Sequence, residues 1–202
     1  MRTLSASRST LEPQLAAHAH EMFGILCDPA IYEFENEPPE SESWLEARFL
    51  RLETRTSPDG SEAWLNWVVR LANGELAGYV QATVLNSNVS YVAYELASRF
   101  WRQGIGSDAV AAVMEELQAH YGVRSFVAVL KAANYRSLGL LGSLGFQRAC
   151  AEQAVAFLAE SDELVMVKPA ATAENAATPV ARYQPPQQDA LVGRVALPPR
   201  SE

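Results

Sequence analysis

Two dense apolar segments joined by an Asn-Gly pair restrict the fold of this chain more than any other feature. The segments are AWLNWVVRL at 63–71 and LAGYVQATVL at 76–85, and Asn73-Gly74 lies between them. Asn-Gly between two such runs is a strong β-hairpin signal, because both residues tolerate the positive φ of a tight turn. A third apolar segment, VSYVAYEL at 89–96, predicts a strand antiparallel to its predecessor.

Helical patterns precede and follow these strands. The apolar positions from Pro13 onward predict a first helix that ends near Asp28-Pro29, and residues 41–55 predict a second. A third helix follows the glycines at 104 and 106 and ends at Tyr121-Gly122.

The segment after this helix alternates again. SFVAVL at 125–130 predicts a short buried strand of the parallel-sheet type. Asn134 is expected to cap a helix that stops at Gly145, and strands are expected at 147–157 and 163–168. This order predicts one domain over residues 1–168, of the mixed α/β (α+β) class, with a central mixed sheet flanked by helices.

Residues 169–202 differ from the rest in composition. Ala, Pro and Gln dominate and no apolar period is visible, so we predict a disordered or loosely packed tail. An arm that packs on a partner subunit is the sharper alternative.

Composition excludes several classes of protein. The net charge of −8 argues against nucleic-acid binding. The two cysteines, Cys27 and Cys150, form no CxxC and no Cys/His cluster, so we expect no disulfide framework and no metal site. No apolar run is long enough for a membrane span and no signal core is visible, which predicts a cytoplasmic protein.

The stretch RFWRQGIGSDAV at 99–110 is a loop that opens into a helix. Glycines permit close approach, and the backbone N–H groups at a helix start bind anions. We predict that the amides of this loop hold a pyrophosphate. The residues assigned to this role are Arg102, Gln103, Gly104, Ile105, Gly106 and Ser107.

Other interpretations of these glycines are weaker. GIGSDA matches the dinucleotide fingerprint, but ASRFWRQ separates it from its strand, and the next strand ends in Leu130-Lys131 where an acidic residue is required. A phosphate-loop NTPase requires G-K-[ST], which the loop lacks. An ordinary glycine turn is the remaining alternative.

Two motifs together resemble a known family. YELASRFWRQGIGSDAV at 94–110, followed by KAANYRSLGLLGSLGF at 131–146, is similar to the core of the GNAT superfamily of acyl-CoA-dependent N-acetyltransferases. In that family a Q/R-x-x-G-x-G/A loop holds the cofactor pyrophosphate, and an N-x-x-S segment follows the next strand. Asn134 and Ser137 supply N-x-x-S here. The N-terminal part with DPAIY at 28–32 most resembles the RimJ/RimL-like group of ribosomal-protein N-terminal acetyltransferases.

The resemblance implies acetyl-CoA as the cofactor and an N-acetyltransferase that acts on a small-molecule or peptide primary amine. The pantetheine arm is then expected beside the strand end at Leu96 and Ala97, with a backbone N–H near Leu96 polarising the thioester carbonyl. Asn134 is expected to contact pantetheine, to cap its helix, or both. Arg136 is expected to reach the adenosine phosphate.

Direct attack by a neutral amine requires a proton acceptor. Glu95 is the first candidate for the catalytic base, at the end of the strand that meets the cofactor, and Glu33 and Glu35 are alternatives. His18 and His20 lie two residues apart on a helix and face different ways. An α-amine (pKa about 8) costs less to deprotonate than a lysine (about 10.4), which favours N-terminal α-amines.

Two departures from the family pattern keep alternatives open. Trp101 stands where the family favours Gln or Arg, and Leu141 stands where many members carry a tyrosine that protonates the leaving thiolate. A catalytically silent acyl-CoA-binding module is therefore the alternative function, and a dinucleotide oxidoreductase a distant one. Asn66, Arg70 and Gln81 are either acceptor contacts or solvent-facing. The acceptor, and whether the protein forms a homodimer, stay open.

Overall fold

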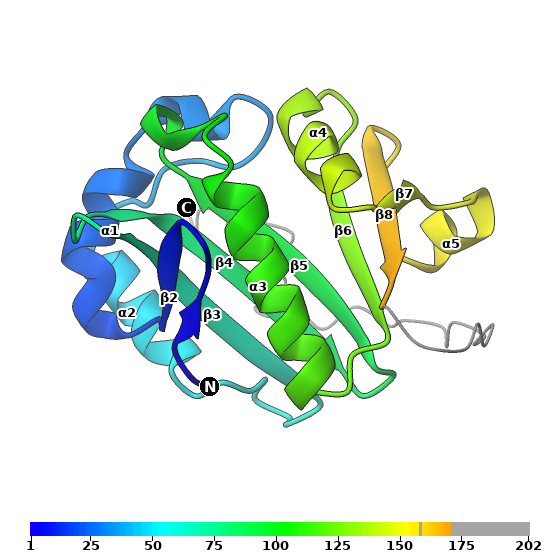
Figure 1. The fold of residues 1–202 in the computed structure, drawn as a ribbon, viewed down its shortest axis with the longest axis horizontal. Coiled ribbons are helices and arrows are strands. Elements are labelled where there is room, and N and C mark those ends of the chain that lie inside the picture. Colours follow the sequence, from blue (N-terminus) through cyan, green and yellow to red (C-terminus); the bar gives the residue numbers. More distant parts are fainter. Residues whose placement is uncertain (158, 171–202) are drawn as a thin grey trace, which may run out of the picture.

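The computed structural model describes residues 1–157 and 159–170, and its centre is a mixed sheet with strand order β1-β2-β3-β4-β5-β6-β8-β7 (Figure 1). The strands are β1 (Leu4–Ser5), β2 (Ser9–Pro13), β3 (Glu62–Leu71), β4 (Leu76–Leu85), β5 (Val89–Leu96), β6 (Ser125–Lys131), β7 (Gln147–Arg148) and β8 (Glu163–Pro169). The α-helices are α1 (Ala19–Leu26), α2 (Glu42–Leu52), α3 (Ile105–His120), α4 (Tyr135–Ser143) and α5 (Ala151–Ala156). The predicted mixed α/β class is confirmed.

The predicted hairpin forms the middle of the sheet. β3 and β4 pair antiparallel from Glu62↔Leu85 to Arg70↔Leu76, and Gly74 takes the positive φ of 89° that the turn requires. β5 then pairs antiparallel with β4, from Gly78↔Leu96 to Val84↔Ser90. The Asn73-Gly74 turn therefore correctly predicted the pairing of β3 with β4, and the apolar pattern of 89–96 predicted the antiparallel β5.

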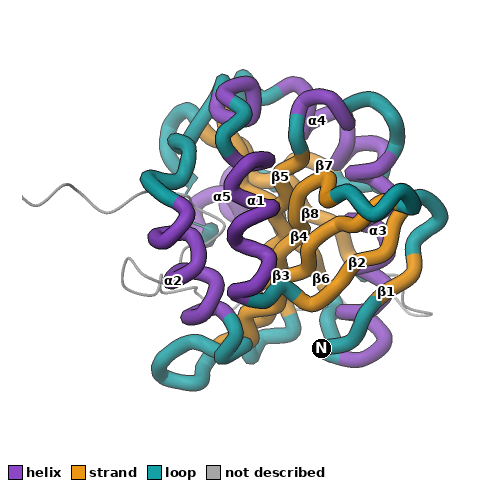
Figure 2. The backbone as a smooth tube through the Cα atoms, turned by 90° about the vertical axis from the view of Figure 1, so that its left-hand side faces the viewer, coloured by secondary structure: helices purple, strands orange, loops and turns teal. Residues whose placement is uncertain are grey.

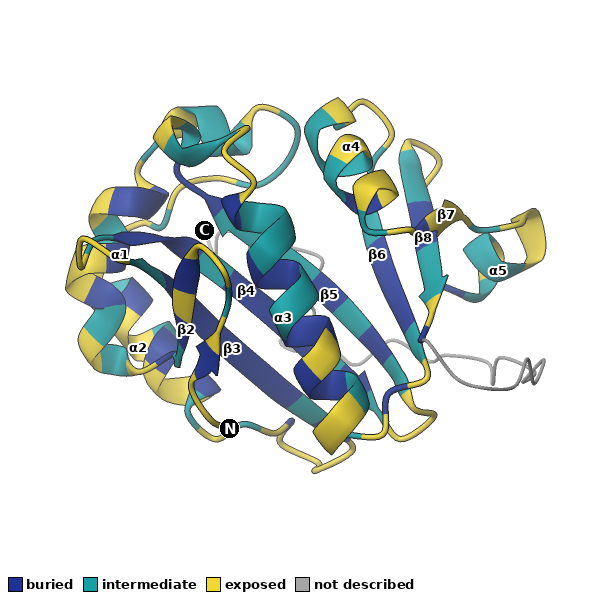
Figure 3. Ribbon diagram, in the orientation of Figure 1, coloured by how far each residue is buried: buried dark blue, intermediate teal, exposed yellow. Residues whose placement is uncertain are grey.

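Helices cover both faces of the sheet. α1 and α2 lie on one side of the strands and α3 on the other (Figure 2). Side chains alternate along β3, so Val68 packs in the cluster beneath α1 and α2 while Trp67 and Val69 pack in the cluster with α3. Buried positions follow the strands and the inner side of α3 (Figure 3).

The N-terminus differs from the prediction. The first helix was expected from Pro13, but Pro13 is the last residue of β2, which pairs antiparallel with β3. A 3-10 turn (η1, Ala16–His18) then leads into α1 at Ala19. Proline has no backbone N–H to donate, which is tolerated both at the end of a strand and in the first turn of a helix. Pro13 therefore did not distinguish the two structures.

The predicted strand at 147–157 is also wrong in most of its length. Only Gln147–Arg148 form β7, and residues 151–156 form α5. The Cys150 N–H donates to the Gln153 side chain at 3.1 Å, which caps the start of this helix. AEQAVA is rich in good helix formers, and that propensity prevails here.

β5 and β6 diverge along their length. They pair in parallel only from Val89↔Ser125 to Tyr91↔Val127, whereas β6 pairs with β8 over its whole length. Figure 1 shows the two strands close together at one end and apart at the other. The last residues of β5, including Glu95 and Leu96, therefore have an edge that faces no neighbouring strand.

Candidate functional site

The glycine loop leads from β5 into α3 through a 3-10 turn (η3, Ser98–Phe100). Arg102 and Gly104 take positive φ values of 59° and 75°, and Gly104 is the N-cap of α3 with no side-chain cap. The first N–H groups of a helix have no acceptor within the helix. Among the described residues nothing caps those of Ile105, Gly106 and Ser107. The loop therefore presents free donors at the positive end of a helix dipole.

These donors open onto a cavity of about 390 Å³ between the loop, the end of β5 and α4. Such a volume suits a small-molecule or cofactor site. The predicted site residues that line it are Glu95, Leu96, Arg102, Gly104, Ile105, Gly106, Ser107, Asn134, Arg136 and Ser137. The structure thus brings the two sequence motifs together around one space.

Two predicted cofactor residues do not line this cavity. Ala97 is fully buried in the cluster beneath α1, and its N–H donates to the Ala77 carbonyl at 3.0 Å. The Gln103 side chain donates to the Arg99 carbonyl at 2.7 Å. Neither residue is therefore part of the cavity wall that the other predicted cofactor residues form.

Asn134 caps α4 as expected: its side chain accepts from the Ser137 N–H at 3.1 Å. It also lines the cavity, so capping and ligand contact can coexist.

Glu95 lies where three cavities meet. It lines the large cavity and two smaller ones, of about 50 Å³ on the α1–α2 side and about 80 Å³ between β5 and β6. Burial raises the pKa of its carboxyl to about 7, while hydrogen bonds from Tyr79 and Asn36 and the charge of Arg48 pull it down. Near neutral pH this carboxylate can both accept and hold a proton.

The two alternative bases lie in different surroundings. Glu33 pairs with the Arg136 guanidinium. Burial raises the pKa of Glu35, which lines the 80 Å³ cavity. Arg136 also stacks over Trp101, with its guanidinium carbon 4.3 Å from the ring centroid. Glu33 and Trp101, both distant from Arg136 in the sequence, therefore hold its guanidinium beside the large cavity.

A buried hydroxyl lies near Leu141. Leu141 is itself in the core, at 1% exposure, and carries no proton to donate. Tyr94 lines the same 80 Å³ cavity as Leu141, and the large cavity as well. The Tyr94 hydroxyl is buried and faces the Ser137 side chain. In the described part of the chain it forms no hydrogen bond of normal distance and angle. Burial raises the pKa of Tyr94 to about 12.

Several residues around the cavity carried no signal in the sequence. Ile31 and Phe34 reach it from the segment after α1. Arg8, in the β1–β2 turn, places its Nε 3.2 Å from the position that a Cβ would take on Gly104. Only the tertiary fold brings these distant segments to the loop.

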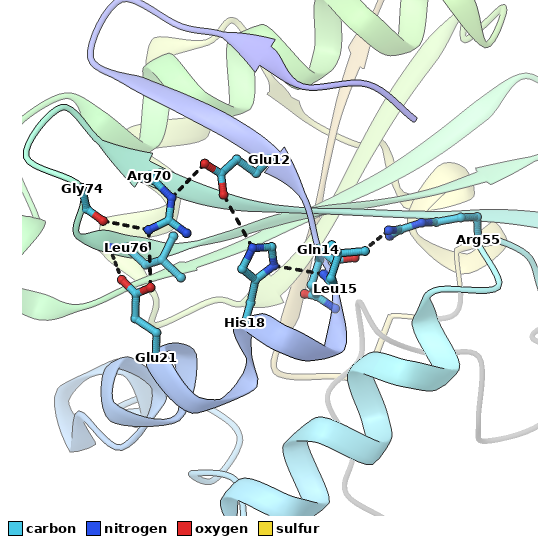
Figure 4. A network of polar contacts seen from close by, with 9 residues as sticks. All are labelled: Glu12, Gln14, Leu15, His18, Glu21, Arg55, Arg70, Gly74 and Leu76. Carbon is cyan, nitrogen blue, oxygen red and sulfur yellow. Dashed lines mark hydrogen bonds and ion pairs between the residues drawn. The ribbon is translucent and has the colours of Figure 1, made fainter.

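A polar network fixes η1 and α1 to the sheet (Figure 4). Arg70 donates to Glu12 at 2.8 Å, and Glu21 accepts from the Leu76 N–H at 2.8 Å. His18 lies in this network and His20 pairs with Glu42, so they share no site, as expected. Arg70, left open as an acceptor contact, belongs to this network instead.

Within residues 1–157 and 159–170, no group of three His, Cys, Asp or Glu side chains could hold a metal ion. In the same residues no helix is long and apolar enough to cross a membrane. Cys27 and Cys150 are exposed and unpaired with each other.

Comparison with known proteins identifies the family. A model of the acetyltransferase (GNAT) domain matches residues 8–147, which is more than half of the chain. The chain belongs to the GNAT acetyltransferase family. It is therefore an acyltransferase, and acetyl-CoA is its cofactor. No curated protein sequence matches this GNAT chain.

Solved GNAT structures share the fold at low identity. The chain is similar to RimL, a ribosomal-protein acetyltransferase in complex with coenzyme A, at 17% identity and a TM-score of 0.68 over 83% of this chain and 97% of that one. A ribosomal-protein-S5-alanine acetyltransferase from Vibrio fischeri is similar at 16% identity and a TM-score of 0.68, over 83% of this chain and 96% of that one. RimJ from Mycobacterium smegmatis in complex with a CoA disulfide is similar at 18% identity and a TM-score of 0.65, over 83% of this chain and 87% of that one.

Proposed function

We propose that the protein transfers an acetyl group from acetyl-CoA to a primary amine that attacks the thioester directly. When bound, acetyl-CoA supplies an activated carbonyl carbon as the electrophile. One observation carries the proposal: the uncapped start of α3 and the Glu95 carboxylate line the same cavity. An anion-binding end and a proton acceptor in one space are what the transfer requires.

The residues around the cavity fit this cofactor. The backbone amides of Ile105, Gly106 and Ser107 would hold its diphosphate, and Arg102 adds a positive charge at the loop. The open edge of β5 at Glu95 and Leu96 would pair with the amides of the pantetheine arm, because β6 does not pair with it there. Asn134 and Ser137 would contact the same arm from α4.

Glu95 takes the proton from the attacking amine in this proposal. With a pKa of about 7, half of the Glu95 carboxyls are ionised at pH 7. Moving a proton from an α-ammonium of pKa about 8 to this carboxylate costs roughly 1.4 kcal/mol, whereas a lysine ammonium of about 10.4 costs roughly 5 kcal/mol. The pKa difference favours α-amines as acceptors.

Tyr94 supplies a proton to the departing thiolate in this proposal. Its hydroxyl is buried, lines the large cavity and shares the small cavity of Leu141, where the family tyrosine is absent. With Tyr94 in this role, the protein has a general acid although Leu141 stands where many family members carry a tyrosine.

Release of the CoA thiol with a panel of amines tests this function. Thiol release that depends on an amine and falls at least about a hundredfold in Glu95→Gln supports it. Glu115→Gln, an exposed carboxylate on α3, is the matched control and should keep full activity. Tight CoA binding with no thiol release from any amine would favour the silent acyl-CoA-binding module instead.

A further inference from the structure

A small polar pocket lies on the α1–α2 face of the sheet. Its volume is about 50 Å³, room for about four water molecules. Three buried amide side chains line it: Gln14 is 2% exposed, Asn66 3% and Gln81 4%. The sequence left Asn66 and Gln81 either solvent-facing or in contact with the acceptor. Their burial removes the first alternative.

The sheet register directs these amides toward Glu95. Asn66 pairs with Gln81, and the Gln14 N–H donates to the Asn66 carbonyl at 2.9 Å. Tyr79, two residues before Gln81, pairs with Glu95. Paired residues and those two apart share one face of a sheet, so the row of amides leads to the catalytic carboxylate. An amine held at Glu95 can extend its own substituent into this pocket.

The pocket has an unsatisfied donor. Gln14 Nε2 is buried and has no hydrogen-bond partner among the described residues. The backbone of Gln14 is fixed, because Arg55 Nη2 donates to its carbonyl oxygen at 2.6 Å (Figure 4). An unpaired buried amide carries an energetic cost that a ligand with an acceptor oxygen removes.

The pocket also has a cation that forms no direct ion pair among the described residues, although its charge acts on Glu95, which lines the same pocket. Arg48 of α2 lines it, with its guanidinium carbon 5.6 Å from the Trp44 ring centroid. None of the ion pairs formed within residues 1–157 and 159–170 includes Arg48. Glu37 also lines the pocket, but this residue is exposed, so solvent screens its charge. A guanidinium beside amide donors is a carboxylate-binding set.

We propose that this pocket receives a carboxylate that the amine acceptor carries a few bonds from its nitrogen, as an aspartyl residue does. The inference rests on the proposed function and narrows its substrate class to acidic amines. Arg48 is the charge partner of that carboxylate, and the amides of Gln14, Asn66 and Gln81 are its hydrogen-bond partners. Free aspartate and an acidic residue at a peptide N-terminus both present this side-chain carboxylate.

Matched pairs of acceptors test the proposal. CoA thiol release is measured with aspartate against asparagine, and with peptides that begin with Asp against peptides that begin with Asn. We expect kcat/KM to favour the acid by about tenfold or more in one of the pairs, and the pair that shows the preference identifies the source. Equal rates in both pairs, or a preference for the amide, would overturn the proposal.

The Arg48 variants show whether the pocket causes the preference. Arg48→Gln should reduce the acid-to-amide ratio to about one, and Arg48→Lys should keep part of it. Arg51→Gln removes the same charge from an exposed position on α2 outside the pocket and should leave the ratio unchanged. The ratio is the decisive quantity, because a change in the Glu95 pKa affects both acceptors equally. A ratio that persists in Arg48→Gln would refute the assignment.

Equilibrium binding separates this inference from the proposed transfer. Calorimetry of the preferred acid with the CoA-loaded protein should show binding that weakens about tenfold in Arg48→Gln. That result without thiol release from any amine would refute the transferase and keep the carboxylate site. Thiol release with no preference for the acid would refute the carboxylate site and keep the transferase.

Discussion

Replacing Glu95 by glutamine should make the protein more stable at pH 8 while it loses activity. The pKa of Glu95 is about 7 in the folded protein against an ordinary 4.5, because burial disfavours its charged form. Between these two pH values the folded state binds more protons than the unfolded state. The free energy of unfolding contributed by Glu95 therefore falls as pH rises through this window.

The magnitude follows from the two pKa values. Their difference, 7 less 4.5, multiplied by about 1.4 kcal/mol per pH unit, gives about 3 kcal/mol at pH 8. Glutamine has the same shape and never ionises, so Glu95→Gln removes this penalty. At pH 4, where the carboxyl is protonated in both states, the variant and the natural protein should be nearly equal in stability.

Urea unfolding followed by tryptophan fluorescence measures the difference. The chain has four tryptophans, of which Trp64 and Trp67 are buried in the sheet. The free energy of unfolding of the variant relative to the natural protein should grow from near zero at pH 4 to about 3 kcal/mol at pH 8. Glu115→Gln should show no such growth. A relative stability that does not change with pH would refute the buried, perturbed carboxylate at the centre of the mechanism.

Three further substitutions test other parts of the site. Gly106→Val places methyl groups between Leu140 and Leu96, where a Cβ alone would already lie 3.0 Å from the Leu140 side chain, and should weaken CoA binding at least about tenfold by calorimetry. Gly142→Val, at an open position on α4, should not. Tyr94→Phe should lower kcat about a hundredfold and leave thermal stability unchanged, because the Tyr94 hydroxyl makes no hydrogen bond of normal geometry among the described residues. The control Tyr91→Phe should keep full turnover. An unchanged kcat in Tyr94→Phe would show that Tyr94 is not the general acid. Gly78→Ala should destabilise the fold by about 3 kcal/mol or more in urea, because its Cβ would lie 2.0 Å from the Glu95 carbonyl oxygen. A normal midpoint would show that β4 and β5 approach less closely.

The sequence predicted the elements whose signals are local. Asn73-Gly74 fixed the hairpin, Asn134 capped α4, and Gly145 ended it with a φ of 83°. Each of these depends on the conformation of a few adjacent residues, which sequence reports directly. The glycine loop and Glu95 lie in one contiguous stretch of sequence, and the structure places both on one cavity, while their roles in binding and catalysis stay predictions.

Elements that depend on distant partners were missed. β1 has two residues, and β2 is held mainly by its pairing with β3, more than fifty residues away. The burial of Asn66 and Gln81 is likewise set by α1 and α2, which cover them. The alternation of side chains along β3 and β4 predicts which face of the sheet Asn66 and Gln81 occupy, but it does not predict whether helices or solvent cover that face.

A crystal structure with CoA bound is the most direct test of the central claim, which is that the start of α3 holds the cofactor diphosphate. We predict diphosphate oxygens within about 3 Å of the backbone nitrogens of Ile105, Gly106 and Ser107. A diphosphate bound elsewhere, with these three amides left facing solvent, would contradict the account.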